Sequence, residues 1–481
     1  MTLLKRRKKT ISTVYIIYSV QTQKRIIASH IKIKTKMKVK NLLLAGLAVA
    51  AMTACSNDID EIVDNGVQTP TEEASMKLYF NFAQTRANGD TSGDKVAGED
   101  LEWNVDGSSI TVVLQYANGG KKLVYNNLTP VTNVVDGSKK YTTPALTVDA
   151  GNNVTVYAFI NPANLSINAS VDPATLALTN ALTLPEKGLD YLASGIAKTN
   201  AFMMSGKTAK AINIVAGSVD NKAEISVDRV AAKLDEKSPK TPFTIDEKGV
   251  VYTDKDNQTA TVKIKLLSHS YSNLSNSTFA LNETRDKSYF NSTVGATNYL
   301  QAYSAQGSYP LDSYYRWLTK GEEANNEVTY CLENYGNGNP TKVHYKGQVY
   351  IGEDAIKSDF YIRAVQNPDA NYIFKDLAEM KAYYKDDMID AITPETSREV
   401  LANLGIRKYT GGICYYEADI NTIVPNKVAS ILRNNWYKLT VTKISEIGTP
   451  TPAPDPIDKT TKLTVETTIN PWTIQINDIE L

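Results

Sequence analysis

Histidine and cysteine are scarce in this chain, with three of each among 481 residues. Only His269 and His344 lie beyond the first 54 residues, which are discussed below. So few imidazole groups disfavour a histidine-containing catalytic triad and a multi-histidine zinc site. Catalysis by carboxylates would still be compatible with this count, but no pair of carboxylates stands out in the sequence.

Motifs for cofactor chemistry are also missing. The sequence has no Gly-x-x-x-x-Gly-Lys-Ser/Thr loop, no Gly-x-Gly-x-x-Gly turn, no Gly-x-Ser-x-Gly elbow and no His-Glu-x-x-His helix. Residues 254–258 begin like a calcium loop, but Thr259 and Lys265 stand where that loop needs a glycine and a bidentate glutamate. We therefore expect a solvated turn there, no metal, no cofactor and no enzymatic activity.

The balance of 52 basic and 52 acidic residues conceals two unlike parts. Residues 1–54 contain 12 Lys and Arg and no Asp or Glu, so the remainder carries 40 basic against 52 acidic residues. Because phosphate groups are bound by basic surfaces, this acidic remainder disfavours a nucleic-acid partner.

One long apolar run is present, at residues 42–54. Its thirteen residues are too few to span a bilayer but suit the core of a secretory signal, and the preceding residues 37–41 are cationic. The small residues before Cys55 resemble the lipobox of bacterial lipoproteins, in which this cysteine would carry lipid and become the first residue after cleavage. The alternative is a cysteine that merely lies near a signal cleavage site.

The flanks of this signal predict where the chain starts and where it is sent. Residues 1–36 fit no leader design, so we interpret them as an upstream extension and expect translation to start at Met37. The acidic run 56–61 resembles the tag that sends lipoproteins of the Bacteroidota to the cell surface. We therefore predict an outer membrane lipoprotein precursor.

A polar tether at residues 58–75 is followed by the first predicted strand. Its apolar residues recur with a period of two, which places them on one face against a core. These residues are Met76, Leu78, Phe80 and Phe82. Arg86 follows four residues later, in a run of small and polar residues that should be exposed and open to proteases.

The rest of the chain alternates short β-branched stretches with Asn, Gly and Asp turns, which predicts a mostly β protein. The expected strands cover residues 110–116, 121–125, 154–160, 223–230, 260–267, 348–351, 360–365, 413–418 and 436–441. Helices are expected at residues 174–182, 393–405 and, from a weaker signal, 374–384. This strand spacing indicates two sandwiches, residues 87–240 and 241–447, although the segment between them could equally be a long loop within one domain.

The C-terminal end combines a stiff segment with an apolar strand. Residues 448–456 carry proline at alternate positions, which predicts an extended, semi-rigid spacer. The apolar residues beyond it are Leu463, Val465, Ile469, Trp472, Ile474, Ile476, Ile479 and Leu481. Their parity changes twice, so a common face needs bulges. Such a strand could reach away from its own domain or return to an edge of its own sandwich.

Two further features have both a structural and a functional interpretation. Cys331 and Cys414 lie in strand-like contexts, where buried free thiols are expected rather than a disulfide. Tyrosine is dense between residues 289 and 317. Such clustered aromatics either bind sugars or partner proteins, or pack within a sandwich that carries a large loop.

Several segments together resemble the major fimbrial subunits (fimbrillins) of the Bacteroidales, the lipoproteins that build type V pili. The matching segments are the leader that ends at Cys55 and residues 85–90, 225–233, 411–416, 432–439 and 470–472. An Arg-Asn-x-x-Tyr run, a proline-rich spacer and a Pro-Trp terminal strand follow one another in that order. The resemblance is much weaker over residues 270–400.

The resemblance implies two transthyretin-like β-sandwich domains with a few short helices, and polymerisation by strand exchange. In the family, a protease cuts after an arginine that Arg86 matches, so Ala87 would become the new N-terminus and residues 55–86 would leave. The removed strand would be residues 76–82, and the donor strand would be residues 463–481. Losing an interior strand exposes an apolar groove and unpaired backbone groups, which a donated strand can satisfy.

These implications predict a structural subunit of a cell-surface fimbrium, the stalk of a pilus, that supports adhesion and biofilm formation. Its expected partners are other copies of itself, minor anchor and tip subunits, the outer membrane through its lipid, and host or bacterial surface ligands. The alternatives are an anchor or tip fimbrial subunit, or a surface lipoprotein that binds glycans.

Overall fold

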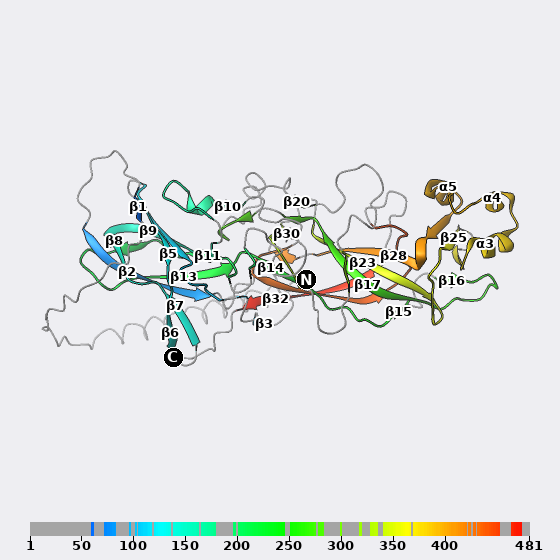
Figure 1. The fold of residues 1–481 in the computed structure, drawn as a ribbon, viewed down its shortest axis with the longest axis horizontal. Coiled ribbons are helices and arrows are strands. Elements are labelled where there is room, and N and C mark those ends of the chain that lie inside the picture. The colour runs from blue at the N-terminus through cyan, green and yellow to red at the C-terminus, as the bar shows by residue number, and fades with distance from the viewer. Residues whose placement is uncertain are drawn as a thin grey trace, which may run out of the picture. The chain divides into compact units, whose positions relative to one another are not determined.

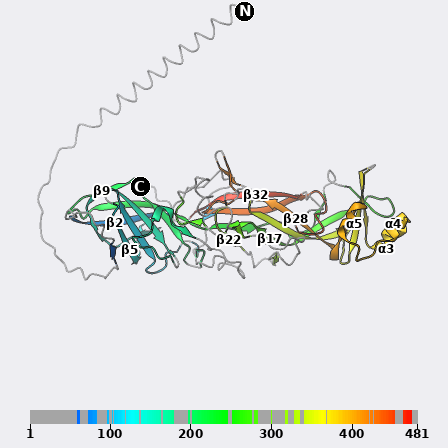
Figure 2. The same cartoon turned by 90° about the horizontal axis from the view of Figure 1, so that it is seen from above.

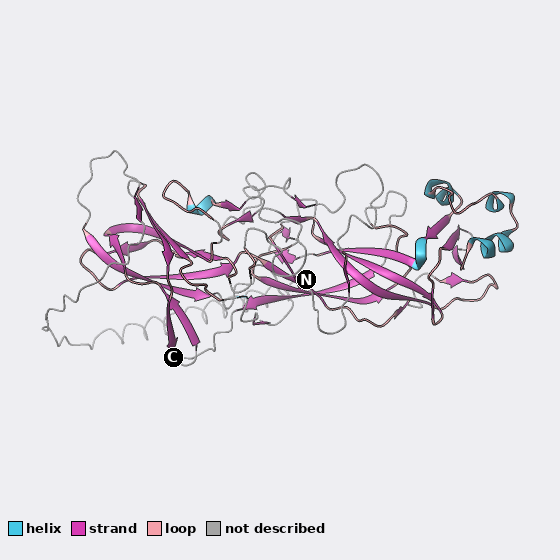
Figure 3. Cartoon of the chain, viewed as in Figure 1, coloured by secondary structure: helices cyan, strands magenta, loops and turns pink. Residues whose placement is uncertain are grey.

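The chain divides into two compact units, Met1–Cys55 and Ser56–Leu481, and all residues described below belong to the second. A computed structural model describes residues 59–61, 72–82, 96–97, 102, 104–117, 120–135, 138–162, 165–178, 196–198, 201–245, 251–275, 278–282, 299–300, 317–319, 328–334, 340–366, 369–420, 422–424, 427–429, 431–452 and 463–473. Within these ranges, no helix is both long and apolar enough to cross a membrane. Strands dominate the described part of the chain (Figure 3), and the prediction of a mostly β protein is confirmed.

The N-terminal half forms the largest sheet (Figure 1), in which eleven strands of the described residues take part. Its order is β1-β5-β4-β9-β11-β13-β2-β7-β6, with β12 beside β9 and β8 beside β2. The bounds are β1 Ile59–Glu61, β2 Glu73–Phe82, β4 Ile110–Tyr116, β5 Lys122–Leu128, β6 Val131–Val135, β7 Ser138–Thr142, β8 Leu146–Asp149, β9 Gly151–Ile160, β11 Met204–Lys207, β12 Ile212–Ile214 and β13 Asn221–Arg229.

This sheet closes over its own apolar face. One core collects buried side chains from β4, β5 and β9 together with buried side chains from β2, β8 and β13. Strand β11 connects the two groups, because it pairs with β9 on one side and with β13 on the other. The close approach requires Gly206, since a Cβ at this position would lie 2.0 Å from the carbonyl oxygen of Ser226.

The C-terminal half contains several sheets. A five-stranded sheet has the order β22-β14-β31-β32-β3, and a six-stranded sheet has the order β15-β17-β23-β24 with β21 beside β17 and β28 beside β23. Their bounds are β3 Val96–Ala97, β14 Ala232–Glu236, β15 Phe243–Thr244, β17 Val262–Ser272, β21 Leu318–Thr319, β22 Thr329–Cys331, β23 Lys342–Ile351, β24 Asp354–Ala355, β28 Ile413–Asp419, β31 Asn435–Ile444 and β32 Leu463–Thr473. Both sheets contribute to one large apolar core.

A smaller four-stranded sheet carries the helices and has its own apolar core, which includes Tyr361, Phe374 and Met380. Its order is β16-β26-β25-β27. The bounds are β16 Tyr252–Thr253, β25 Phe360–Gln366, β26 Asp369–Phe374, β27 Ile406–Tyr409, α3 Leu377–Tyr384, α4 Asp387–Asp390 and α5 Arg398–Asn403. The remaining pairs are β10 Ala177–Leu178 with β19 Thr278–Phe279, β18 Leu274–Ser275 with β20 Tyr299–Leu300, and β29 Thr422–Val424 with β30 Lys427–Ala429.

Each predicted strand has a counterpart, although several are longer than expected. Strand β4 has the predicted bounds, whereas β23 begins six residues before the predicted start at residue 348. Its extra residues pair with β17 and β28, which are distant in sequence. Strand β14 comes before residue 240, where the sequence places the domain boundary. It nevertheless pairs with β22 and β31 in the five-stranded sheet of the C-terminal half.

The helix predicted at residues 174–182 is wrong over its described part. Pro173–Thr175 form a single 3-10 turn, and Ala177–Leu178 then form β10. The predicted start signal is present, because the Asp172 carboxylate accepts a hydrogen bond from the backbone N–H of Ala174 at 3.0 Å. Pairing of β10 with β19, which is distant in sequence, replaces the helix.

The other two helices form with shifted starts. Helix α5 begins at Arg398 rather than near residue 393, because the Ser397 hydroxyl accepts a hydrogen bond from the N–H of Val400. It stops before Gly405, whose φ of 69° suits the predicted helix end. Helix α3 begins at Leu377 after Asp376 caps it, whereas Phe374 still belongs to β26.

His344 is buried in β23 and bears on the pH dependence of stability. Its Nε2 lies 2.6 Å from the Ser272 hydroxyl. Burial, with a smaller contribution from Lys342, lowers the pKa of His344 from 6.5 to about 3. Between these two values the unfolded chain binds a proton that the folded protein excludes, so stability falls as the pH falls below about 6.5.

We predict that a His344→Gln variant loses less stability than the original chain when the pH is lowered from 7 to 5. The histidine should account for about 2 kcal/mol of that loss, at about 1.4 kcal/mol per pH unit. Urea unfolding of both proteins at the two pH values measures this difference. Equal pH dependence of the two unfolding free energies would contradict the prediction.

Candidate functional site: strand β2 and its slot

Strand β2 lies in the interior of the eleven-stranded sheet. One edge pairs in parallel with β13, from Met76 opposite Asn221 to Phe82 opposite Val227. The other edge pairs antiparallel with β8 near its start and with β7 further along. We call the surface formed by β13, β8, β7 and the core beneath β2 the β2 slot. Removal of β2 would leave backbone groups unpaired along both sides of this slot.

One face of β2 is buried in the core of this sheet. Ala74, Met76, Leu78 and Phe80 are at most 6% exposed. Lys77, between them, faces solvent. Burying the three large side chains contributes about 5–9 kcal/mol, at about 1.5–3 kcal/mol each. This contribution is comparable to the whole unfolding free energy of a domain, about 5–15 kcal/mol, so the slot needs an occupant.

Polar groups around the slot also bind the main chain of β2. The Thr143 hydroxyl accepts a hydrogen bond from the N–H of Leu78 at 3.1 Å, and the Thr143 N–H donates to the Leu78 carbonyl at 3.1 Å. On the other edge, the Asn221 amide donates to the Ser75 carbonyl at 3.0 Å. The carbonyl of Ser218 accepts from the N–H of Ser75 at 3.2 Å. These residues could not be predicted from the sequence, because only their position beside β2 distinguishes them from other Thr, Asn and Ser residues.

The terminal strand β32 pairs with the chain's own five-stranded sheet (Figure 2). It runs antiparallel to β31 from Leu463 opposite Ile444 to Pro471 opposite Asn435, with a register shift near Val441. On its other side, within the described residues, it pairs with the two residues of β3, opposite Trp472 and Thr473. It therefore lies in its own sheet between β31 and the short β3, next to the edge that was one of the two positions left open by the sequence.

Residues 448–452, in the segment before β32, are bound to the rest of the chain. Thr449 and Tyr415 exchange two backbone hydrogen bonds of 2.9 Å, and the Tyr409 hydroxyl donates to the Gly448 carbonyl at 2.9 Å. A Cβ at Gly448 would lie 2.1 Å from the Tyr415 carbonyl oxygen. Residues 448–452 of the predicted semi-rigid spacer are buried or half-buried, and these contacts hold them to Tyr409 and Tyr415, while residues 453–456 lie outside the described residues.

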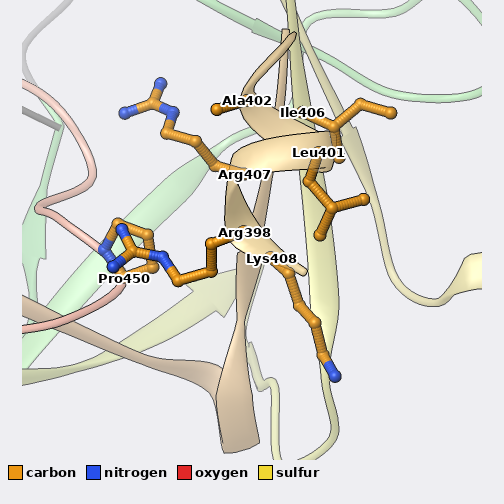
Figure 4. Close-up of a pocket in the computed structure, with 7 residues that line it drawn as sticks. All are labelled: Arg398, Leu401, Ala402, Ile406, Arg407, Lys408 and Pro450. Atoms are coloured by element: carbon orange, nitrogen blue, oxygen red, sulfur yellow. The ribbon is translucent and has the colours of Figure 1, made fainter. Parts of the chain in front are cut away.

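A small pocket borders this segment (Figure 4). It is lined by Arg398, Leu401, Ala402, Ile406, Arg407, Lys408 and Pro450. The guanidinium group of Arg398 lies beside Pro450 and donates to the Thr451 hydroxyl at 3.1 Å. The Lys408 amine points away and pairs with Asp359 at 2.9 Å. Helix α5 therefore holds the segment that leads to β32. Pro452, which is buried, is the last residue of this segment that the structure describes.

Two segments that carried the sequence resemblance meet at the end of β13. Arg229 is 1% exposed, and its guanidinium group donates to the side-chain carbonyl of Asn434 at 3.2 Å and to the backbone carbonyl of Glu102 at 2.8 Å. The Asn434 amide donates in turn to Asp228 at 3.3 Å. Burial lowers the pKa of Arg229 to about 10, with Glu102, Tyr330 and Asp228 opposing the shift, so this side chain stays charged at neutral pH.

A second buried charge lies next to the first. The Lys233 amine contacts the Glu102 carboxylate at 2.8 Å, with both side chains 1% exposed, and lies 3.9 Å from the centre of the Trp436 ring. The Tyr330 hydroxyl donates to the same carboxylate at 2.5 Å. These contacts make residues 225–233 and 432–439 a structural junction of the described fold.

Several predicted site residues lie outside the described residues. They are Cys55, Arg86, Ala87, Ile474, Ile476, Ile479 and Leu481, together with most of the tyrosine-rich segment 289–317. Phe82 belongs to the backbone of β2. Leu463, Val465, Ile469 and Trp472 belong to β32. The roles assigned to these residues stay predictions.

Cys331 and Cys414 are in the state that the sequence predicts. Cys331 and Cys414 are free and fully buried. Burial raises the pKa of Cys414 to about 12 and also raises the pKa of Cys331.

Residues 254–258 form the expected turn, in which the Asp254 carboxylate accepts hydrogen bonds from two backbone N–H groups. Within the described ranges, no group of three His, Cys, Asp or Glu side chains is arranged to hold a metal ion.

One protein-family model matches the C-terminal region of the chain. Residues 407–478 match the family model described as major fimbrial subunit protein type IV, fimbrillin, C-terminal. The match spans the Arg433–Asn434 turn, β31 and β32. It confirms the resemblance to fimbrillins inferred from the sequence. No curated protein matches the chain.

A comparison with solved structures finds similarity to proteins from Parabacteroides distasonis and Porphyromonas gingivalis, among others. A candidate cell adhesion protein from Parabacteroides distasonis is 12% identical with a TM-score of 0.44, covering 84% of this chain and 100% of that one. The tip fimbrial protein Mfa3 from Porphyromonas gingivalis is 13% identical with a TM-score of 0.35, covering 83% and 100%. A fimbrial assembly protein from Parabacteroides distasonis is 10% identical with a TM-score of 0.31, covering 83% and 99%.

We predict that Leu78→Ala destabilises the chain by about 2–5 kcal/mol, because it removes a fully buried side chain from β2. Lys77→Ala on the solvent face of the same strand is the matched control and should change stability by less than about 0.5 kcal/mol. Urea unfolding monitored on the N-terminal sheet measures both. Equal effects of the two substitutions would show that β2 is not packed as described.

Proposed function

We propose that this chain, whose residues 407–478 belong to the fimbrillin family, is a structural subunit of a cell-surface fimbria that polymerises by protease-triggered strand exchange. The observation that carries the proposal is the position of β2. This strand is interior, its apolar face is buried, and the chain reaches Arg86 four residues after its end. One cut after Arg86 would therefore separate β2 covalently from the sheet that it completes.

The state without β2 would be unfavourable in water. Apolar residues of the core would be exposed, and β13, β7 and β8 would each present unpaired backbone groups. A strand from a second copy that alternates apolar and polar residues would satisfy both requirements. Residues 463–481 provide such a strand, with the apolar positions given above.

The present position of β32 is compatible with its release. In its own sheet it pairs along one side with β31 and, among the residues that the structure describes, on the other side with the two residues of β3. In the slot of a second copy it would pair along both edges, as β2 does. The gain in backbone pairing and in buried apolar area would favour exchange between copies once β2 has left.

The N-terminal segment would deliver the subunit before assembly. Lipid on Cys55 would hold the precursor at the outer membrane, and the cut after Arg86 would release Ala87 onward together with the vacant slot. Other copies of the chain are the main partners in the polymer, with minor anchor and tip subunits at its ends. Adhesion to host or bacterial surfaces and support of biofilm formation would follow from the assembled fibre.

We predict that fibres sheared from cells that produce residues 37–481 begin at Ala87 and form a ladder of high mass. Arg86→Ala should abolish both the new N-terminus and the ladder, whereas Arg285→Ala, a second arginine that serves as the control, should change neither. Mass spectrometry of the N-terminus and electrophoresis of unheated samples measure these outcomes. An intact lipidated monomer that begins at Cys55 would contradict the stalk assignment and favour an anchor subunit.

We also predict that a disulfide between β31 and β32 blocks assembly. Lys438 and Thr468 are direct register partners. Residues directly opposite in antiparallel strands have Cα atoms about 4.5–5.5 Å apart, within the range of about 4.4–6.8 Å that a disulfide needs. The variant Lys438→Cys/Thr468→Cys should stay monomeric when oxidised and polymerise after reduction.

The control for this lock is Lys438→Ser/Thr468→Ser, which should polymerise in both conditions. The native thiols Cys331 and Cys414 are fully buried and should not interfere. Light scattering after cleavage, with and without reductant, follows assembly. Assembly of the oxidised variant at the unmodified rate would show that β32 is not the donor.

A further inference from the structure

The β2 slot recognises main-chain atoms as well as apolar side chains. Thr143 is 1% exposed and lies between β7 and β8, opposite Leu78. Its hydroxyl and its backbone N–H bind the N–H and the carbonyl of Leu78, so one residue holds both polar groups of one position of the strand. Because these contacts involve only backbone atoms of β2, they place no demand on the side chain at that position except that it is not proline.

Asn221 performs a similar role on the opposite edge. It is 8% exposed, and its side-chain carbonyl accepts from the N–H of Val215 at 2.9 Å. Its amide group lies 3.1 Å from the Val215 carbonyl and 3.2 Å from the Ser218 carbonyl, and it also reaches the Ser75 carbonyl of β2. Asn221 therefore shapes the loop 215–218 while binding the strand.

The loop that Asn221 shapes adds two contacts to the main chain of β2. The carbonyl of Ser218 accepts from the N–H of Ser75, and the N–H of Gly217 donates to the carbonyl of Glu73, each at 3.2 Å. When β2 leaves, Thr143 and Asn221 lose partners at buried positions. A buried polar group without a partner is costly, so these groups favour a new strand that offers backbone groups in the same register.

We infer that Thr143 and Asn221 form a main-chain clamp that receives and registers the incoming strand of a second copy, an inference that rests on the proposed function. The clamp requires an N–H at the position of Leu78 and, through Ser218, at the position of Ser75. Pro471 is the one proline within residues 463–481. The clamp therefore excludes every register that places Pro471 at either of these positions.

The test uses the full chain with residues 84–90 replaced by the recognition sequence of a site-specific protease, so that cutting does not depend on the natural enzyme. After cutting, fluorescent peptides exchange into the slot, and fluorescence anisotropy gives their affinity. One peptide is Glu73–Phe82, and a second has an ester in place of the amide between Lys77 and Leu78, which removes the N–H that Thr143 accepts. Receptors are the unmodified chain, Thr143→Val and the control Thr143→Ser.

The ester should weaken binding about tenfold or more in the unmodified chain and in Thr143→Ser, which keeps the hydroxyl. It should weaken binding less than about threefold in Thr143→Val, where no acceptor faces the N–H. An ester effect of equal size in Thr143→Val and the unmodified chain would overturn the clamp. Thermal melting of the uncut variants shows whether each is folded, and Thr143→Ala, which also removes the hydroxyl and should show the same small ester effect, takes the place of Thr143→Val if that variant does not fold.

A second arm uses the peptide of residues 463–481 on the same receptors. Weaker binding to Thr143→Val and Asn221→Ala than to Thr143→Ser would show that the clamp also holds the donor. Binding of equal strength to all of these receptors would overturn the clamp's role in assembly. If the Glu73–Phe82 peptide shows the clamp and the terminal peptide does not bind at all, the proposed donor strand is wrong while the contacts of Thr143 with β2 stand.

Discussion

Buried charges at the crossing from β13 to β14 are the constraint on which the rest of the structure depends. Arg229 and Lys233 are each 1% exposed, and their partners include Glu102 and Asn434. Removing one partner of a buried charge typically costs about 3–5 kcal/mol, so these contacts must form together. The N–H of Asn434 also donates to the backbone carbonyl of Ala231 at 2.9 Å. The end of β13 and the start of β31 are thereby held in one network.

This network positions both strands of the proposed exchange. Strand β13, which ends at Arg229, forms one wall of the β2 slot. Strand β31, which begins at Asn435, is the present neighbour of β32. The side-chain contacts described above join Arg229 and Lys233 to Glu102, Asn434, Tyr330 and Trp436, which belong to segments other than β2 and β32. Both strands could therefore change partners while their neighbours keep their positions, which is what assembly from folded subunits requires.

Local features could be predicted from the sequence wherever the pattern of apolar and polar residues along one strand is sufficient. The alternation of Met76, Leu78 and Phe80 with more polar residues correctly identified a strand with one buried face. The contexts of Cys331 and Cys414 correctly indicated buried free thiols. Prediction failed where distant partners competed with local signals. Pairing with β19 replaces the helix expected after Asp172.

The sequence by itself determined the mostly β character of this protein, the buried face of β2 and the similarity of residues 407–478 to the C-terminal region of fimbrillins. Each of these follows from patterns of neighbouring residues. Tertiary structure decided that β2 lies between β13, β8 and β7, that Thr143 and Asn221 bind its main chain, and that β32 lies on β31. Periodicity fixes which side chains share a face of a strand, but the partners of its backbone groups come from segments far along the chain and are set by the fold as a whole.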